Sequence, residues 1–147
     1  MSNELDYVAW AAGFFDGEGC VAAYCYLQKE GYLQYDLTIQ VGQVELAPLR
    51  RLEEMWGGHI NVQNEARAGW RRTYCWKLYG RKAASALTEM IPYLTVKKEQ
   101  AELFVRLNAM VSAGIKRGRG QAVSEEEKAE RADIVRNIAL LKTRVAA

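Results

Sequence analysis

The sequence predicts an α+β fold in which helices cover one face of a single antiparallel sheet. Two pairs of segments alternate apolar and polar residues with a period of two, the pattern of strands that bury one face. Segments with apolar residues at helical spacing precede, separate and follow these pairs. The predicted order is therefore helix, hairpin, helix, hairpin and then further helices.

The first helix is predicted over residues 5–15, LDYVAWAAGFF, which contain no proline. Trp10 and Phe14 lie one turn apart on one face of this helix. On another face, Ala9 and Gly13 are small residues four positions apart, a spacing that lets a second helix approach closely. The following DGEG, residues 16–19, is predicted to end the helix.

Both predicted hairpins have one apolar and one polar face. A turn at residues 29–31 joins the strands of the first hairpin, and Gly69 marks the turn of the second. The residues predicted to point toward the core are Val21, Ala23, Cys25, Leu27, Leu37, Ile39, Val41, Ile60, Val62, Tyr74, Trp76 and Leu78.

A helix is predicted between the hairpins, over residues 46–55. Pro48 falls in its first turn, where the missing N–H costs little, and Gly57 and Gly58 close the segment.

Three further helices are predicted after the second hairpin, over residues 82–91, 96–111 and 124–144. The first stops before Pro92, and Ser124 and Glu127 have the spacing of a capping box for the last.

Length and composition favour one folded domain spanning residues 1–147. Half of the residues are hydrophobic, at 50%, which supplies a real core. No signal peptide and no membrane-spanning stretch is recognisable, so we expect a cytoplasmic protein, or one in an organellar matrix if organelle-encoded, and neither a secreted protein nor one with a membrane partner. Cys20, Cys25 and Cys75 lack metal-ligand spacing and are expected to be packed, reduced thiols.

The net charge of +2 hides a marked asymmetry along the chain. Up to Glu65 the basic residues are Lys29, Arg50 and Arg51, and carboxylates outnumber them. From residue 67 to residue 119 the balance reverses, and this segment predicts a polyanion-binding surface, with a solvated basic face as the alternative. Its basic residues are Arg67, Arg71, Arg72, Lys77, Arg81, Lys82, Lys97, Lys98, Arg106, Lys116, Arg117 and Arg119.

The outward faces of the hairpins carry side chains that suit the edges of DNA bases. Amides suit adenine, arginine and lysine suit guanine or phosphate, and aspartate accepts from cytosine. A solvated sheet face, the alternative, usually holds more Lys and Glu and fewer amides and tyrosines. The predicted DNA-binding residues are Tyr24, Tyr26, Gln28, Gln34, Asp36, Thr38, Gln40, Asn61, Gln63, Arg71, Arg72, Thr73 and Lys77.

Residues 11–19, AAGFFDGEG, resemble the signature of the LAGLIDADG homing endonucleases. The resemblance is specific because the motif ends a helix directly before a predicted hairpin, as in that family, and the element order extends it over nearly the whole chain. It implies an αββαββα fold with a four-stranded antiparallel saddle sheet per subunit and extra C-terminal helices. A single copy of the motif implies half an active site, and therefore a homodimer on a roughly palindromic target.

The resemblance also implies roles for individual residues. Glu18 and the backbone carbonyl of Gly17 match ligands of a divalent metal, Mg²⁺ with Mn²⁺ also accepted, while Asp16 is expected to cap or orient the helix end. Gln43 and Lys97 match the catalytic periphery, although Lys98 leaves that register open by one residue. The implied dimer-interface residues are Ala9, Ala12, Gly13 and Asp16.

Two positions bear on the chemistry in other ways. A basic residue expected one turn after Gln43 is replaced by Ala47 or Pro48, so Arg50 or Arg51 is the candidate substitute. His59 is the one histidine of the sequence and cannot by itself form the histidine-based metal site of an HNH nuclease. It is expected to be a turn or DNA-contacting residue.

The implied function is that of a hydrolase serving intron or intein mobility: a site-specific double-stranded DNA endonuclease that cuts a long pseudo-palindromic site by metal-dependent phosphodiester hydrolysis and leaves short 3′ overhangs. One alternative is an RNA maturase, with the host intron RNA as its partner. The other is a non-cleaving DNA-binding regulator, which would not need an acidic residue at position 18.

Overall fold

The computed structural model describes residues 4–116 and 123–143. Its elements, in order, are α1 (Glu4–Glu18), β1 (Gly19–Leu27), β2 (Leu33–Gln43), α2 (Leu46–Trp56), β3 (His59–Asn64), β4 (Thr73–Tyr79), α3 (Gly80–Met90), the short 3₁₀ helix η1 (Ile91–Tyr93), α4 (Lys98–Lys116) and α5 (Glu125–Lys142). The predicted order of helices and hairpins is confirmed.

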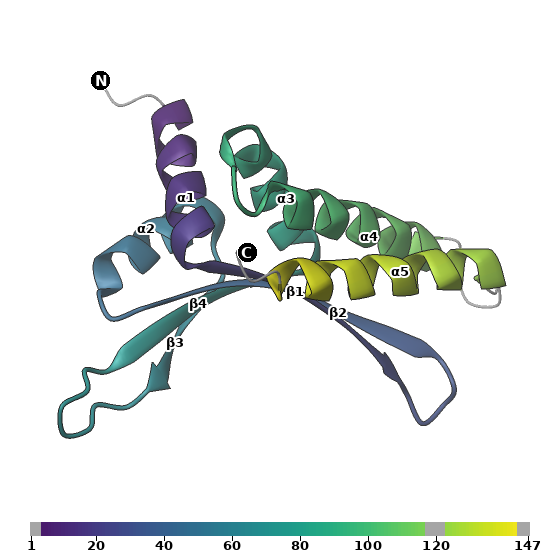
Figure 1. Ribbon diagram of the computed structural model, residues 1–147, viewed down its shortest axis with the longest axis horizontal. Helices are drawn as coiled ribbons and strands as arrows, with labels where there is room; N and C mark the ends of the chain where they lie inside the picture. Colours follow the sequence, from purple (N-terminus) through teal and green to yellow (C-terminus); the bar gives the residue numbers. More distant parts are fainter. Residues whose placement is uncertain (1–3, 117–122, 144–147) are drawn as a thin grey trace.

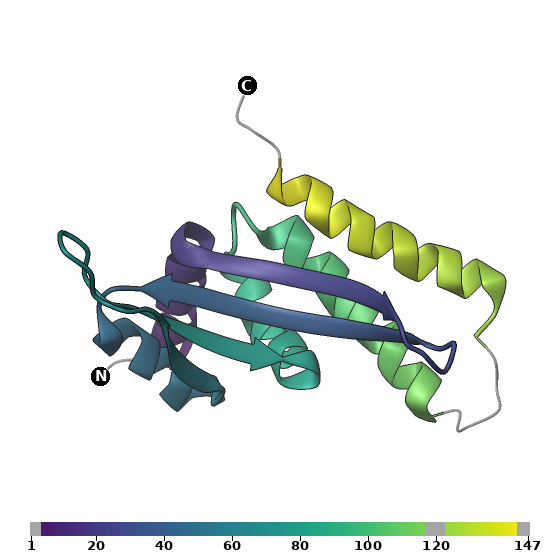
Figure 2. The same ribbon diagram turned by 90° about the horizontal axis from the view of Figure 1, so that it is seen from below.

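The four strands form one antiparallel sheet in the order β1-β2-β4-β3. Figure 1 shows the sheet as an arch below the helices, with the β1–β2 and β3–β4 hairpins projecting to opposite sides. Seen from below in Figure 2, the face of the sheet opposite the helices is open along its length, and we call it the concave face. The predicted α+β fold with a four-stranded antiparallel saddle is therefore confirmed.

The core lies between the covered face of the sheet and the helices. Phe15 of α1, Leu49 of α2, Phe104 of α4 and Ile39 and Trp76 of the sheet are almost completely buried there. Burial of these apolar side chains is the main force that holds the helices on the sheet. The indole N–H of Trp76 donates to the Gly57 carbonyl oxygen at 2.8 Å, which satisfies the polar group of this buried ring.

The bounds of three helices differ from prediction, and α3 spans Gly80–Met90 rather than residues 82–91. Helix α1 continues to Glu18, so the DGE of the motif is helical and β1 follows without a loop. Helix α4 begins at Lys98, two residues later than predicted, and continues to Lys116 rather than residue 111. Directly before it, residues 95–97 give their backbone N–H groups to Asp16 of α1.

The predicted burial of the strands is wrong near the ends of the hairpins. Cys25, Leu27 and Val62 were expected in the core but are exposed; Figure 1 shows both hairpins bending downward, away from the helices that cover the middle of the sheet. The expectation of packed thiols therefore fails for Cys25. Cys75 is buried, as its expected packing predicts, and Ala22, on the face of β1 opposite the core, is buried as well.

Helix α5 begins as its capping box predicts. The Ser124 side chain accepts a hydrogen bond from the Glu127 backbone N–H at 3.1 Å. The helix was predicted to reach Arg144, which lies outside the described residues. Within the described chain, no helix combines the length and apolar character needed to cross a membrane.

Candidate active site and nucleic-acid interface

The junction of α1 and β1 is sharp and depends on Gly19. A Cβ atom at Gly19 would stand 2.3 Å from Cδ2 of Phe15, whose ring is fixed in the core with 1% of its surface exposed. The chain can pass from helix to strand here only without a side chain at Gly19. Glu18 immediately precedes this point and is exposed, and within the described residues its carboxylate has no hydrogen-bond or ion-pair partner.

Asp16 caps a helix other than its own. Its carboxylate accepts backbone N–H groups from Thr95 at 2.7 Å, Val96 at 3.0 Å and Lys97 at 2.9 Å, directly before α4. A carboxylate is favourable here because the N–H groups at a helix start lack helical partners and carry partial positive charge. Asp16 was expected to cap or orient the end of its own helix, and its contacts join that end of α1 to the segment directly before α4.

The Lys97 side chain in turn binds the backbone of Asp16. Its ammonium donates to the backbone carbonyl oxygen of Asp16 at 2.6 Å, one peptide before Gly17. Lys97 is half-buried in this position, whereas Lys98 is exposed. Of the two lysines, the structure therefore brings Lys97 to the end of α1.

Gln43 ends β2 at the same end of the β1–β2 pair as Glu18, because Gly19 pairs with Val41. Its side-chain oxygen accepts the Val44 backbone N–H at 2.9 Å. The amide nitrogen is the group of Gln43 that remains for a water or a phosphate oxygen.

The two candidate substitutes for the missing cation, Arg50 and Arg51, lie on α2. The Arg51 guanidinium lies over the rings of Tyr7 and Trp10, at 5.6 Å and 4.9 Å from their centroids. Arg50 lines a depression between α2 and β3 together with Asn61 and other residues. Arg51 thus packs on α1 and Arg50 lies beside β3, and the replacement of the cation by one of them stays a prediction.

The metal-binding capacity of one chain is small. Among residues 4–116 and 123–143, no group of three or more His, Cys, Asp or Glu side chains is placed to hold a metal. Divalent cations such as Mg²⁺ take six oxygen ligands, which one free carboxylate and the neighbouring Gly17 carbonyl do not supply. A metal at Glu18 needs further donors from a second chain, nucleic acid or water.

Cys75 stays a neutral thiol on the concave face. Burial raises the pKa of its thiol, an effect that Lys77 opposes and Cys20 reinforces. A protonated, buried thiol is a poor metal ligand and nucleophile at neutral pH.

The strand register gathers the predicted DNA-binding side chains on the concave face. Residues paired across antiparallel strands share a face. The concave-face pairs are Cys20 with Gln40, Ala22 with Thr38, Tyr24 with Asp36, Tyr26 with Gln34, Thr38 with Tyr79, Gln40 with Lys77, His59 with Lys77 and Asn61 with Cys75. This common face runs along the whole arch in Figure 2.

The outer part of β3 is irregular. A bulge between Val62 and Asn64 leaves Gln63 outside the regular pairing, while the Asn64 side chain donates to the Thr73 hydroxyl at 3.1 Å. Gln63 nevertheless reaches the concave face, because its side-chain oxygen lies 2.9 Å from where a Cβ of Gly42 would stand. Gly42 thus leaves room for the Gln63 side chain.

The two arginines of the second hairpin are paired with carboxylates. Arg71 contacts Glu45 at 2.8 Å and Arg72 contacts Glu65 at 2.9 Å, all four side chains being largely exposed. Exposed ion pairs contribute little stability, so these guanidinium groups can exchange partners readily. Of the basic segment, Arg117 and Arg119 lie outside the described residues.

Several residues of this surface were absent from the predicted set. Tyr79 shares the concave face through its pairing with Thr38, and counting alternate positions from Lys77 would have found it; His59, which was expected to be a turn or DNA-contacting residue, shares this face through its pairing with Lys77. Asn64 was hidden by the bulge, which no sequence pattern announces. Trp70, at the turn of the second hairpin, is 76% exposed.

No protein-family model and no curated protein matches this sequence. Solved structures do. The homing endonuclease I-CvuI, in complex with its target in the presence of Ca, is 21% identical, with 97% of this chain and 85% of that chain covered and a TM-score of 0.75. The archaeal intron-encoded homing endonuclease I-Vdi141I, complexed with DNA, is 15% identical, with coverages of 98% and 89% and a TM-score of 0.77.

A third similar structure is longer than this chain. The LAGLIDADG homing endonuclease I-GzeII, in complex with its DNA target, is 18% identical; 99% of this chain matches 45% of that chain, with a TM-score of 0.63. This chain has the fold of LAGLIDADG homing endonucleases, and the fold that the motif implied is confirmed.

Proposed function

We propose that this chain is a divalent-metal-dependent endonuclease that cuts double-stranded DNA at a specific site and acts as a homodimer. The observation that carries the proposal is Glu18, a carboxylate without a partner among the described residues, placed where α1 enters a sheet with a polar concave face. Similar folds in I-CvuI and I-Vdi141I are bound to DNA, which supports the same ligand here.

A homodimer would bring two copies of α1 together. Gly13 and Gly17 are exposed and lie one turn apart, and a Cβ atom at either would meet no other atom within 4 Å, so a second backbone can come close along this stripe. Ala9 continues the stripe and is half-buried. Ala12 does not belong to it, because it is fully buried in the core of its own chain. The match of this chain to 45% of I-GzeII supports an assembly of two such units.

Two Glu18 carboxylates facing each other across a two-fold axis would repel, and divalent cations relieve such repulsion. Carboxylates together with Gly17 carbonyl oxygens form a hard donor set that suits Mg²⁺, with Mn²⁺ as a substitute. The complexes of I-CvuI with Ca and with Mg support the use of a divalent cation. Such a cation supplies stabilisation of negative charge on the phosphate and a lower pKa for a nearby water.

The chain's own residues supply the surroundings of the scissile phosphate. The Lys97 ammonium has three donors, of which one is bound to the Asp16 carbonyl oxygen, so two remain for phosphate oxygens as charge develops. Asp16 holds the backbone of Lys97 in place. The Gln43 amide nitrogen is placed at the same end of the sheet to orient water or phosphate.

The sheet sets the length of the recognised DNA. The nine residues of β1 lead from the end of α1 to the tip of the first hairpin. At ~3.3 Å per residue this strand spans ~30 Å, or roughly nine base pairs of B-DNA. Two subunits would therefore read a pseudo-palindromic site of roughly 20 base pairs, with concave-face amides and tyrosines contacting base edges and Lys77 contacting phosphate.

The proposal is tested by incubating the protein and Mg²⁺ with a plasmid library that carries randomised palindromic sites. We expect linear plasmids that share one site and carry short 3′ overhangs, with no linear product in EDTA. Binding to a structured intron RNA without cutting at any library site would favour the maturase instead. Sequence-specific DNA binding without cutting would favour a regulator.

A further inference from the structure

The outer half of the β1–β2 hairpin extends beyond the main core. Leu27 and Leu33 near its tip are 73% and 39% exposed, so apolar packing holds this part of the hairpin weakly. Helix α5 lies alongside it: Gly31, Tyr32 and Leu33 of the hairpin line a depression together with Lys128 and Arg131 of α5. The position of the hairpin therefore depends on its contacts with α5.

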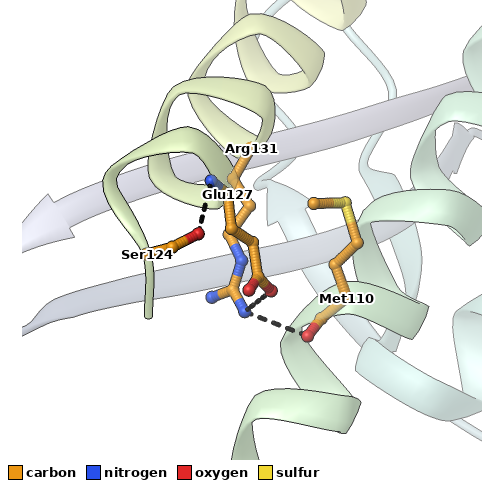
Figure 3. Close-up of polar contacts among 4 residues, drawn as sticks. All are labelled: Met110, Ser124, Glu127 and Arg131. Atoms are coloured by element: carbon orange, nitrogen blue, oxygen red, sulfur yellow. Dashed lines mark hydrogen bonds and ion pairs between the residues drawn. The ribbon is translucent and has the colours of Figure 1, made fainter. Parts of the chain in front are cut away.

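Arg131 is the polar centre of this contact. It is 5% exposed, and its guanidinium donates to the Glu127 carboxylate at 2.8 Å and to the Met110 carbonyl oxygen of α4 at 3.0 Å (Figure 3). A buried guanidinium is costly to desolvate, and here one terminal nitrogen makes both hydrogen bonds while the buried Nε has no hydrogen-bond partner among the described residues. The bond to Met110 thus links α5 to α4 in a direction-specific way that an apolar side chain would not provide.

The same guanidinium lies against the hairpin. Its central carbon is 5.4 Å from the centroid of the Tyr35 ring of β2. The residues on either side of Tyr35, Gln34 and Asp36, point to the concave face, where they pair with Tyr26 and Tyr24. A movement of Tyr35 would be transmitted through the backbone to these side chains.

We propose that Arg131 is a positioning residue for DNA recognition, one that fixes the outer half of the first hairpin against α4 and α5. This inference rests on the proposed function. Tyr35 pairs with Cys25, seven residues beyond Glu18, which corresponds to ~23 Å or roughly seven base pairs from the cut. Arg131 thus governs discrimination at outer base pairs, while pairs near Gln40 and Lys77 are read independently of it.

The test uses the full chain with Arg131→Met and Glu127→Gln together, so that no unpaired charge is left buried. Cleavage rates are measured on the selected site and on all its single base-pair substitutions. We expect discrimination at positions roughly six to nine pairs from the cut to fall about tenfold, because one mismatched pair normally costs that much or more, and discrimination at inner positions to stay unchanged.

The matched control is Arg136→Met with Asp133→Asn. This pair also lies on α5, but both side chains are largely exposed. The control should keep the wild-type profile at every position. An unchanged profile in the Arg131 double variant, or an equal loss at inner and outer positions, would overturn the inference.

Tyr35→Leu decides the matter if the double variant does not fold. It removes the ring against Arg131 but keeps the α4–α5 contact, and it should reproduce the outer-position loss; a wild-type profile in a folded Tyr35→Leu protein would refute the inference. Cleavage by the wild-type chain distinguishes failure of the proposed endonuclease function from failure of the proposed role of Arg131. If the wild-type chain cuts no site, both proposals are wrong. If the wild type and the variants cut with the same selectivity, only the role of Arg131 is wrong.

Discussion

Asp16 and Lys97 hold each other through two separate hydrogen bonds. The Asp16 carboxylate accepts the Lys97 backbone N–H at 2.9 Å, and the Lys97 ammonium donates to the Asp16 backbone carbonyl oxygen at 2.6 Å. Because Asp16 lies two residues before Glu18 on α1, this arrangement couples the start of α4 to the proposed metal ligand. One acid of the motif thereby organises the site, while the other stays free for a cation.

Asp16→Ala should weaken both the fold and the chemistry. Loss of the cap on three N–H groups should lower the free energy of unfolding by about 1–2 kcal/mol, measured by urea denaturation. Lys97 loses its backbone anchor, so single-turnover cleavage should slow by on the order of tenfold or more. Asp16→Asn, which keeps one acceptor oxygen, should lie between; a wild-type cleavage rate for a folded Asp16→Ala protein would argue against the coupling.

Gly19→Ala should be destabilising because the new methyl group would collide with the buried Phe15 ring. Overpacking of this kind should lower the free energy of unfolding by about 1–3 kcal/mol and displace Glu18, with reduced cleavage. Gly42→Ala is the matched control. Its methyl group would also meet an atom at 2.9 Å, but that atom is the mobile end of Gln63. Equal losses of stability in Gly19→Ala and Gly42→Ala would show that the Phe15 ring moves aside, which would contradict this prediction.

DNA binding should weaken steeply with salt, because phosphate contacts release counterions. Lys77→Ala should make the slope of log Kobs against log[salt] shallower by about one unit, measured by fluorescence anisotropy. Lys142→Ala, in the last turn of α5, serves as the control and should keep the wild-type slope. A nearly flat wild-type plot would remove the phosphate contacts from the account.

Gly13→Leu should disperse the homodimer, since a bulky side chain would separate the two α1 backbones. Sedimentation velocity should show a monomer, and cleavage should be lost with it. Ala132→Leu places the same side chain on the exposed part of α5 and should remain dimeric. An unaltered sedimentation profile for Gly13→Leu would place the interface elsewhere.

The sequence predicted the fold well where its pattern is local. The two-residue alternation identified all four strands, and Ser124 with Glu127 located the start of α5. Prediction from the sequence was wrong where segments far apart in the chain contact each other. The partner of Asp16 lies about 80 positions away in sequence, so no local pattern reveals that residues 95–97 stay outside α4.

The candidate site divides in the same way. Strand parity placed Gln34, Asp36, Thr38 and Gln40 on one face, and the structure confirms that placement. Parity is lost at the bulge beside Gln63, and burial of Cys75 depends on neighbours from other strands. The position of Arg51 over Tyr7 and Trp10 likewise arises from the packing of α2 on α1, which the sequence alone does not encode locally.

Glu18→Gln is the most direct test of the account. The substitution removes one negative charge per subunit and keeps the size of a side chain that is exposed and without a partner among the described residues, so folding should be unaffected. We predict that the variant binds the selected DNA site as a dimer with wild-type affinity but yields no cleavage product at any Mg²⁺ concentration. Cleavage at the wild-type rate would contradict the assignment of Glu18 as the metal-binding carboxylate.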